Sequence, residues 1–334
     1  MRLLILGGTR FVGRHIVEAA RDRGYEITLF NRGETNPGLF EDVEQVHGDR
    51  DGGLEGLESG SWDVAVDVSG YAPRVVRQSA ELLADKVGHY TFISSISVFE
   101  DFKASGMDEG APLAQLDDPS VEEVTNETYG ALKAHCEQVV REHYPHSSTI
   151  VRPGLVAGPH DPTDRFTYWV VRADRGGRIL APGDPNRGIQ FIDARDLARF
   201  TLDVTEAHTN DTFNVTGPVD PLPMEVFLDE CRAAVRKKPR LVWVDDDFLT
   251  EHLDPGELPL WVPATWEALR GFMSIDCGRA LWAGLSFRPV SETIKDTLKW
   301  WHEREDDGEL QAGIDAERER ELLDAYKAAA QPSS

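Results

Sequence analysis

The chain begins with a short apolar run, a glycine-rich turn and a helix-like segment, in the sequence MRLLILGGTRFVGRHI. Residues 2–7 are typical of a buried strand, and the stretch 13–23 has the apolar spacing of a helix. Gly7 permits a tight turn, and Gly13 lets the helix lie close to the sheet while its N-terminus faces a phosphate. Arg10 stands between them, where another glycine would be expected. The opening therefore predicts a nucleotide-binding turn, with a ligand-free glycine corner as the structural alternative.

Strand and helix signals alternate through the first half of the chain, a pattern that builds a parallel sheet. The predicted strands are 2–7, 25–31, 43–47, 62–69, 89–95, 148–153 and 212–217, and the predicted helices are 13–23, 73–86 and 129–144. The fold class is therefore α/β, a doubly wound parallel sheet of the Rossmann type with a smaller C-terminal α/β domain. We expect a nucleotide-binding domain at 1–160, completed by a segment at about 189–217. The remainder of 161–330 would form mainly a substrate domain and C-terminal helices.

Two stretches stand outside this alternation. Residues 100–125 are acidic and rich in glycine and proline, which predicts a long loop of the kind that is usually functional. Residues 303–331 are rich in charged residues and alanine, which predicts a helix at the edge of the fold or against a second subunit. A homodimer is therefore one assembly that the sequence allows.

The end of the second predicted strand, in the sequence LFNRG, bears on which nucleotide binds. An acid about 20 residues after the glycine turn usually holds the ribose 2′-hydroxyl of NAD, whereas arginine suits the 2′-phosphate of NADP. Here Arg32 follows Gly13 by nineteen residues, and the first acid after the end of this strand is Glu34. Because Arg10 would reach the same phosphate from the turn, we predict NADP, with NAD as the alternative. A surface arginine in a turn is the competing interpretation of Arg32.

Further along, the motif YGALK places Tyr129 and Lys133 on one face of a helix. An ammonium beside a phenol favours the phenolate, so we expect Lys133 to lower the pKa of Tyr129 toward neutrality. The preceding strand ends in ISSISVF, where Ser95 would hydrogen-bond the reacting oxygen, with Ser94 and Ser97 as competitors for that role.

Composition excludes several classes of function. The formal net charge of −24 opposes binding to a phosphate backbone, and the strongest basic cluster is RKKPR at 236–240. No apolar run approaches the length of a membrane span, and three widely spaced cysteines suit free thiols in the cytoplasm. The ten histidines show no ligand spacing, since His143 and His146 span a helix end and a turn. We therefore expect a cytoplasmic protein with no metal site and no nucleic-acid or membrane partner.

Taken together, the motifs GGTRFVG, NRG, GDRD, ISSISVF, YGALK, IVRPGLVAGP and FIDARDLA resemble the extended short-chain dehydrogenase/reductases, the NAD-dependent epimerase/dehydratase family. They occur in that family's order over about residues 1–217. GGTRFVG and LFNRG resemble one branch, the chloroplast stem-loop-binding proteins and their bacterial relatives. Plant members of that branch bind RNA and lack the intact YxxxK pair that this chain keeps. The middle glycine of the family's usual GxxGxxG is Arg10 here.

This resemblance implies a catalytic triad of Ser95, Tyr129 and Lys133. It places the segment at Arg152 and Pro153 along the nicotinamide side of the cofactor, and Asp193 and Asp196 in the return segment. The cofactor-binding residues we expect are Gly7, Thr9, Arg10, Phe11, Val12, Gly13, Asn31, Arg32, Asp49, Arg50, Ser69, Gly70, Ser94, Tyr129, Lys133 and Pro153. For Asp49, bonding to the adenine amino group competes with a turn-forming role. The expected substrate residues are Arg165, Tyr168, Arg187 and Gln190.

The sequence leaves the net reaction open among reduction, epimerisation and dehydration of a sugar nucleotide or another small molecule. Hydride would move between the nicotinamide and a substrate carbon while Tyr129 passes a proton, and Lys133 would also bind the nicotinamide ribose. A hypothesis of a different class is a nucleotide-sensing or RNA-binding protein built on a dehydrogenase scaffold.

Overall fold

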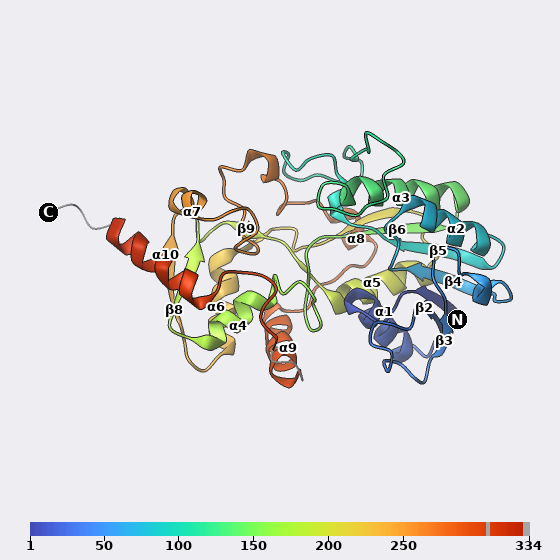
Figure 1. The fold of residues 1–334 in the computed structure, drawn as a ribbon, viewed down its shortest axis with the longest axis horizontal. Coiled ribbons are helices and arrows are strands. Elements are labelled where there is room, and N and C mark those ends of the chain that lie inside the picture. The colour runs from blue at the N-terminus through green and yellow to red at the C-terminus, as the bar shows by residue number, and fades with distance from the viewer. Residues whose placement is uncertain (305–307, 330–334) are drawn as a thin grey trace.

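The computed structural model describes residues 1–304 and 308–329 (Figure 1). Its centre is a parallel sheet of seven strands in the order β11-β6-β5-β4-β1-β2-β3. The strands are β1 (Arg2–Leu6), β2 (Glu26–Asn31), β3 (Glu44–His47), β4 (Trp62–Asp67), β5 (Val87–Ile93), β6 (Ser148–Pro153) and β11 (Thr212–Val215). The order reverses direction between β1 and β4, which confirms the doubly wound α/β fold.

Both faces of the sheet are covered, because successive side chains of a strand point to opposite sides. In β1, Leu3 and Ile5 pack into one apolar cluster, whereas Leu4 and Leu6 pack into another on the opposite face. The first cluster is covered by α1 (Phe11–Asp22) and α5 (Ala194–Glu206), and the second by α2 (Pro73–Leu83) and α3 (Tyr129–His143). The unbroken apolar run of β1 is thus explained by burial on both sides.

The C-terminal part builds a second apolar core at the other end of an elongated molecule (Figure 1). Parallel strands β8 (Arg178–Pro182) and β13 (Arg240–Val244) pair there, next to helices α4 (Thr167–Arg175) and α6 (Met224–Ala234). The other elements are the strand pairs β7 (Val156–Ala157) with β10 (Ile192–Asp193) and β9 (Gly188–Ile189) with β12 (Leu222–Pro223), and helices α7 (Asp246–His252), α8 (Gly278–Trp282), α9 (Val290–Glu303) and α10 (Ala316–Ala329). Short 3₁₀ turns occur at Glu55–Leu57, Ile96–Val98 and Glu267–Leu269.

After residue 160 the chain returns to the first part twice. Strand β11 completes the sheet, and Ala280 and Leu285 join the apolar cluster around α1 and α5. We propose the division into 1–160 with 189–217, and 161–330, with residues 278–285 added to the first unit. Helix α10 lies within the predicted stretch 303–331, of which 305–307, 330 and 331 lie outside the described residues.

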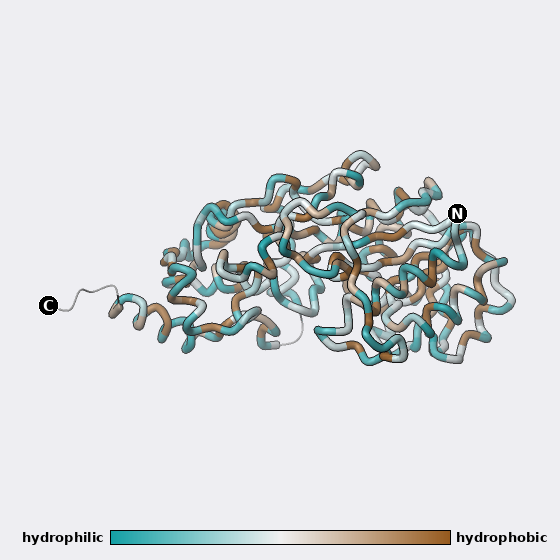
Figure 2. The backbone as a smooth tube through the Cα atoms, turned by 90° about the horizontal axis from the view of Figure 1, so that it is seen from above, coloured by the Kyte–Doolittle hydropathy of each residue, from teal (hydrophilic) through white to brown (hydrophobic). Residues whose placement is uncertain are grey.

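Residues 100–125 contain no helix or regular strand, as predicted for a loop. Its first part is tied to the C-terminal part by backbone hydrogen bonds, from Gly106 N to Ser274 O (2.7 Å) and from Gly271 N to Phe102 O (2.6 Å). Figure 2 shows apolar residues along the strands of the central sheet and hydrophilic residues along the outer helices. Among the helices of residues 1–304 and 308–329, none is long and apolar enough to cross a membrane.

Candidate active site

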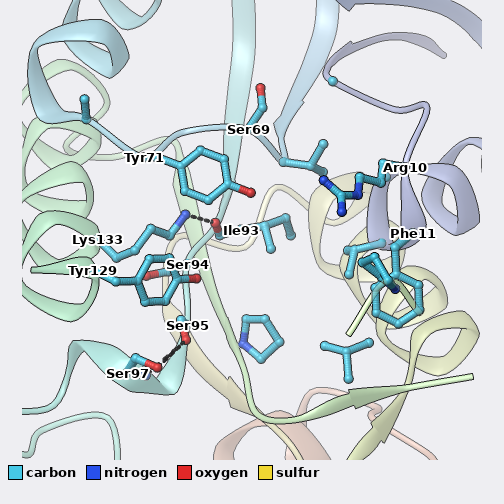
Figure 3. Close-up of a pocket in the computed structure, with 18 of the residues that line it drawn as sticks. Arg10, Phe11, Ser69, Tyr71, Ile93, Ser94, Ser95, Ser97, Tyr129 and Lys133 are labelled. Carbon is cyan, nitrogen blue, oxygen red and sulfur yellow. Dashed lines mark hydrogen bonds between the residues drawn. The ribbon is translucent and has the colours of Figure 1, made fainter. Parts of the chain in front are cut away.

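A cavity of 1210 Å³ lies at the carboxyl ends of the sheet strands, where parallel α/β folds bind ligands. Its walls come from the turn after β1, the ends of β2, β4 and β5, the start of α3 and the segment that follows β6. In Figure 3, Arg10 and Phe11 lie on the opposite side of the cavity from Tyr129 and Lys133. All predicted cofactor-binding residues line it except Gly70, whose carbonyl accepts a hydrogen bond from Lys133 instead.

The turn after β1 leaves its backbone open toward the cavity. Gly7 has φ +108°, which favours glycine, and a Cβ there would lie 2.6 Å from Val68. A Cβ on Gly13 would lie 2.9 Å from the Cα of Gly8, so α1 begins in direct contact with the turn. No acidic side chain occupies the first turn of α1, which keeps the positive end of the helix dipole available to an anion. These features fit the pyrophosphate of a dinucleotide.

At the end of β2, the side chains of Arg32 and Glu34 both border the cavity. They form an exposed ion pair with 3.4 Å between Nε and Oε2, and the Arg32 side chain is 61% exposed. An exposed pair of this kind is worth little, so its guanidinium can exchange Glu34 for a phosphate at small cost. Arg10 borders the same end of the cavity and caps α1 without a side-chain hydrogen bond.

Asp49 and Arg50 follow strand β3, and their side chains have different contacts. Asp49 Oδ1 accepts from the backbone N of Asp51 (2.8 Å), the turn-forming role that competed with adenine recognition. Arg50 is buried, and its guanidinium forms a bidentate pair with Asp67. Burial opposes ionisation of Asp67, but the charge of Arg50 outweighs it and lowers the pKa of that carboxyl. The Arg50 guanidinium therefore holds strand β4 in place, although the residue borders the cavity.

Helix α3 brings Tyr129 to the cavity and sets Lys133 one turn further along. Ser95 lies near Tyr129 and acts on the pKa of its phenol. The Ser95 hydroxyl donates its hydrogen bond to Ser97 (3.1 Å between the two Oγ atoms; Figure 3). Ser94 points elsewhere, because its Oγ donates to the buried carboxylate of Glu137 (2.5 Å). Of the three competing serines, Ser95 is the one that acts on the pKa of the phenol.

Lys133 does not act on Tyr129 as the sequence predicted. Its ammonium donates to the carbonyls of Gly70 (2.8 Å) and Ile93 (2.6 Å). Burial lowers the pKa of Lys133 to about 8. The pKa of Tyr129 is raised, mainly by burial and also by nearby Tyr71, while Ser95 opposes the rise. The predicted lowering of the phenol pKa is therefore wrong for this structure, in which the phenol is uncharged at neutral pH.

The four predicted substrate residues do not come together. Arg165 borders the cavity, near Tyr129. Tyr168 is buried against Trp169 in the C-terminal core, with 4.9 Å between ring centroids. The Arg187 guanidinium is paired with Asp246 (2.9 Å from Nη1 to Oδ1). Gln190 is buried and bonds to the carbonyls of residues 218 and 275, so its amide is used inside the protein.

Several residues that line the cavity were missed by the motif analysis. Tyr71 lies 6.4 Å from Tyr129 between ring centroids, and Phe272 reaches the cavity from the C-terminal part. Asp161, in the sequence GPHDPTDRF, is a buried acid at the same wall as Arg165. An acid between histidine and proline just after a sheet strand was the available signal for it. Among residues 1–304 and 308–329, no group of three metal-binding side chains is present.

The seven-stranded parallel sheet defines a fold of the Rossmann class, with a cavity at the carboxyl ends of its strands. Residues 74–216 match the model of the NAD dependent epimerase/dehydratase family. The UDP-Glc/GlcNAc 4-epimerase of Campylobacter jejuni superposes with a TM-score of 0.67 at 16% identity, covering 91% of this chain and 99% of that one. MoeE5, solved in complex with UDP-glucose and NAD, has a TM-score of 0.62 at 16% identity over 90% of this chain and 99% of that chain.

A curated protein adds a relative at the sequence level. The chloroplast stem-loop binding protein of 41 kDa b from Arabidopsis thaliana is 26% identical over an alignment of 240 residues that covers 65% of this chain. The matched region spans 58% of that relative's length. The chain is therefore similar to the NAD dependent epimerase/dehydratase family over residues 74–216, which is less than half of its length.

Proposed function

We propose that the chain is an NADP(H)-dependent oxidoreductase that acts at a hydroxyl or carbonyl carbon of a small molecule. The observation that carries this proposal is the juxtaposition of the open glycine turn and Tyr129 across one cavity. When bound, the nicotinamide supplies or accepts the hydride. The protein's own residues then have to bind the dinucleotide, orient the substrate oxygen and move one proton.

The dinucleotide would be held along the predicted cofactor residues. The backbone from Gly7 to Gly13 and the start of α1 would face the pyrophosphate. Arg10 and Arg32 would grip a 2′-phosphate, because both guanidiniums border the cavity at that end and neither is held in a buried pair. This arrangement supports NADP over NAD. Lys133, held by two carbonyls, would bind the nicotinamide ribose.

Proton transfer would use Tyr129 and Ser95. The phenol donates a proton to the substrate oxygen in the direction of reduction and accepts it in the direction of oxidation. Ser95, which lies near the phenol and borders the cavity, would exchange its bond to Ser97 for a bond to the same substrate oxygen. Because the phenol of Tyr129 is uncharged before the reaction, it already carries the proton that reduction of a carbonyl requires.

Replacement of Tyr129 with phenylalanine tests this assignment. Loss of a general acid typically costs about 10²- to 10⁴-fold in rate, so Tyr129→Phe should lose turnover to that extent and keep its dissociation constant for NADPH. The matched control is Tyr25→Phe, since the Tyr25 hydroxyl bonds Glu206 at the surface, outside the cavity lining. The readout is NADPH consumption with a panel of aldehydes and ketones. Equal rates for Tyr129→Phe and wild type would remove Tyr129 from the mechanism.

The printed name of the Arabidopsis relative favours a second candidate function, binding of structured RNA. The formal net charge of −24 opposes it, because a phosphate backbone would be repelled. Filter binding with a stem-loop RNA at two salt concentrations separates the two functions. Retention that weakens as salt rises would favour RNA binding, and no retention at either salt concentration would favour the oxidoreductase.

A further inference from the structure

The Lys133 ammonium lies against two aromatic rings. Its Nζ atom is over the Phe92 ring, 4.2 Å from the centroid, and over the Tyr71 ring, 5.3 Å from the centroid. Both distances fall within the roughly 6 Å over which a ring face attracts a cation. Figure 3 shows the Tyr71 ring beside the ammonium. Phe92 belongs to β5 and Tyr71 follows β4, so two neighbouring strands of the sheet each supply one ring.

These rings matter because the Lys133 side chain is buried, with 2% of the residue exposed. Burial disfavours the charged form of an amine unless the surroundings replace the lost water. The carboxylates whose charges favour the ammonium, Asp67 and Glu137, are each paired with an arginine. The direct contacts of the ammonium are therefore neutral: two backbone carbonyls and two ring faces.

Charged and titratable groups act on Lys133 from the elements packed around it. Burial lowers the pKa of Lys133 to about 8, and Arg50 acts in the same direction. Cys136 and Glu137 from α3 and Asp67 from β4 oppose this lowering of the pKa. Replacement of a ring leaves all of these groups in the protein, so the contribution of the ring can be measured by itself.

We propose that Tyr71 and Phe92 form an aromatic cage that holds the Lys133 ammonium charged and in place, so that it can donate its third hydrogen to the dinucleotide. This inference rests on the proposed function and assigns two positioning residues to it. An ammonium has three hydrogens, and the carbonyls of residues 70 and 93 take two of them. A ring face attracts the cation but not the neutral amine, so the cage favours the charged form.

The cage depends on the ring of Tyr71 and not on its hydroxyl group. The phenols of Tyr71 and Tyr129 are both uncharged at neutral pH, since burial raises the pKa of each. Phenylalanine at position 71 keeps the ring face, whereas leucine keeps an apolar side chain without one. The two substitutions therefore separate the attraction of the ring from the exclusion of water.

The test measures the pKa of Lys133 in the nucleotide-free protein by NMR, from the signal of ¹³C-labelled lysine Cε as a function of pH. The signal of Lys133 is assigned by its loss in Lys133→Arg. Tyr71→Leu should lower the pKa of Lys133 by about 0.5 or more, from the usual strength of a contact between a cation and a ring. Tyr71→Phe is the matched control and should leave this pKa unchanged.

Phe92→Leu should lower the pKa of Lys133 further than Tyr71→Leu does, because its ring lies closer to the ammonium. Phe92 is fully buried, whereas Tyr71 is 47% exposed, so Tyr71→Leu keeps the test decisive if Phe92→Leu does not fold. A second readout is the dissociation constant for NADPH as a function of pH. Binding should weaken as the ammonium loses its proton, and in Tyr71→Leu this weakening should begin at a lower pH.

Two results would overturn the inference: the same pKa of Lys133 in wild type and Tyr71→Leu, or an equal fall of this pKa in Tyr71→Phe and Tyr71→Leu. Either result with normal binding of NADPH removes the cage and leaves the proposed function standing. Failure of wild type to bind NADPH removes the proposed function, and with it the part of the cage in cofactor binding.

Discussion

Asp161 should make the protein less stable at neutral pH than it would be with a neutral side chain at that position. Burial raises the pKa of this carboxyl from 3.8 to about 6. A folded-state pKa above the unfolded value means that ionisation destabilises the fold, fully above the folded pKa and not at all well below the unfolded one. At about 1.36 kcal/mol per pKa unit, the cost is about 3 kcal/mol at about pH 7.5, and about 1 kcal/mol remains at about pH 4.5.

The perturbation is Asp161→Asn, which keeps an oxygen for the two bonds from Thr163 and removes the charge. The asparagine amide brings its own unpartnered donor, but that contribution does not change with pH. The stability of Asp161→Asn minus that of wild type should therefore be greater at about pH 7.5 than at about pH 4.5 by about 2 kcal/mol. Urea unfolding of both proteins at the two pH values measures this difference. A difference that is constant with pH, or larger at the acidic pH, would refute the reasoning.

Two further predictions concern the arginines Arg10, Arg32 and Arg50, which border the cavity. The double variant Arg10→Gly with Arg32→Asp should shift the ratio of NADPH to NADH affinity toward NADH by about tenfold or more, because each charge-assisted contact is worth about 1.5–3 kcal/mol. Fluorescence titration with both cofactors measures this ratio. An unchanged ratio would show that neither arginine contacts the 2′-phosphate. Arg50→Met should destabilise the fold by about 3–5 kcal/mol, since it leaves the Asp67 carboxylate buried without the opposite charge of Arg50. Urea unfolding measures the loss. A loss below about 1 kcal/mol would contradict the prediction and place the pair in the range of exposed ion pairs.

The sequence predicted the fold, and the residues it predicted for the cofactor line one cavity apart from Gly70, because their signals are local. The glycine turn lies between the strand and the helix that it joins, and Tyr129 and Lys133 share one helix. What it could not predict depends on contacts between distant residues. Arg187 pairs with Asp246, 59 residues later in the chain, and does not line the cavity. The Lys133 ammonium donates to the carbonyls of residues 70 and 93.

Asp161 was missed for the same reason. Its burial depends on a loop whose backbone is fixed by Trp300 and Gln311, both more than a hundred residues later in the chain. The lack of a hydrogen-bond partner for its Oδ2 atom among the described residues is a property of that packing, and the motif GPHDPTDRF by itself reads as a polar turn. The glycine-turn side of the cavity is therefore encoded locally, whereas the wall at Asp161 depends on packing against the C-terminal part.

Every step proposed for this protein requires a nicotinamide dinucleotide to bind in the cavity between Gly7 and Tyr129. Calorimetric titration of the purified protein with NADPH and with NADH measures this binding. We predict saturable binding of one dinucleotide per chain, tighter for NADPH than for NADH. Heats of dilution alone with both dinucleotides, in a folded protein first freed of any bound nucleotide, would contradict the account.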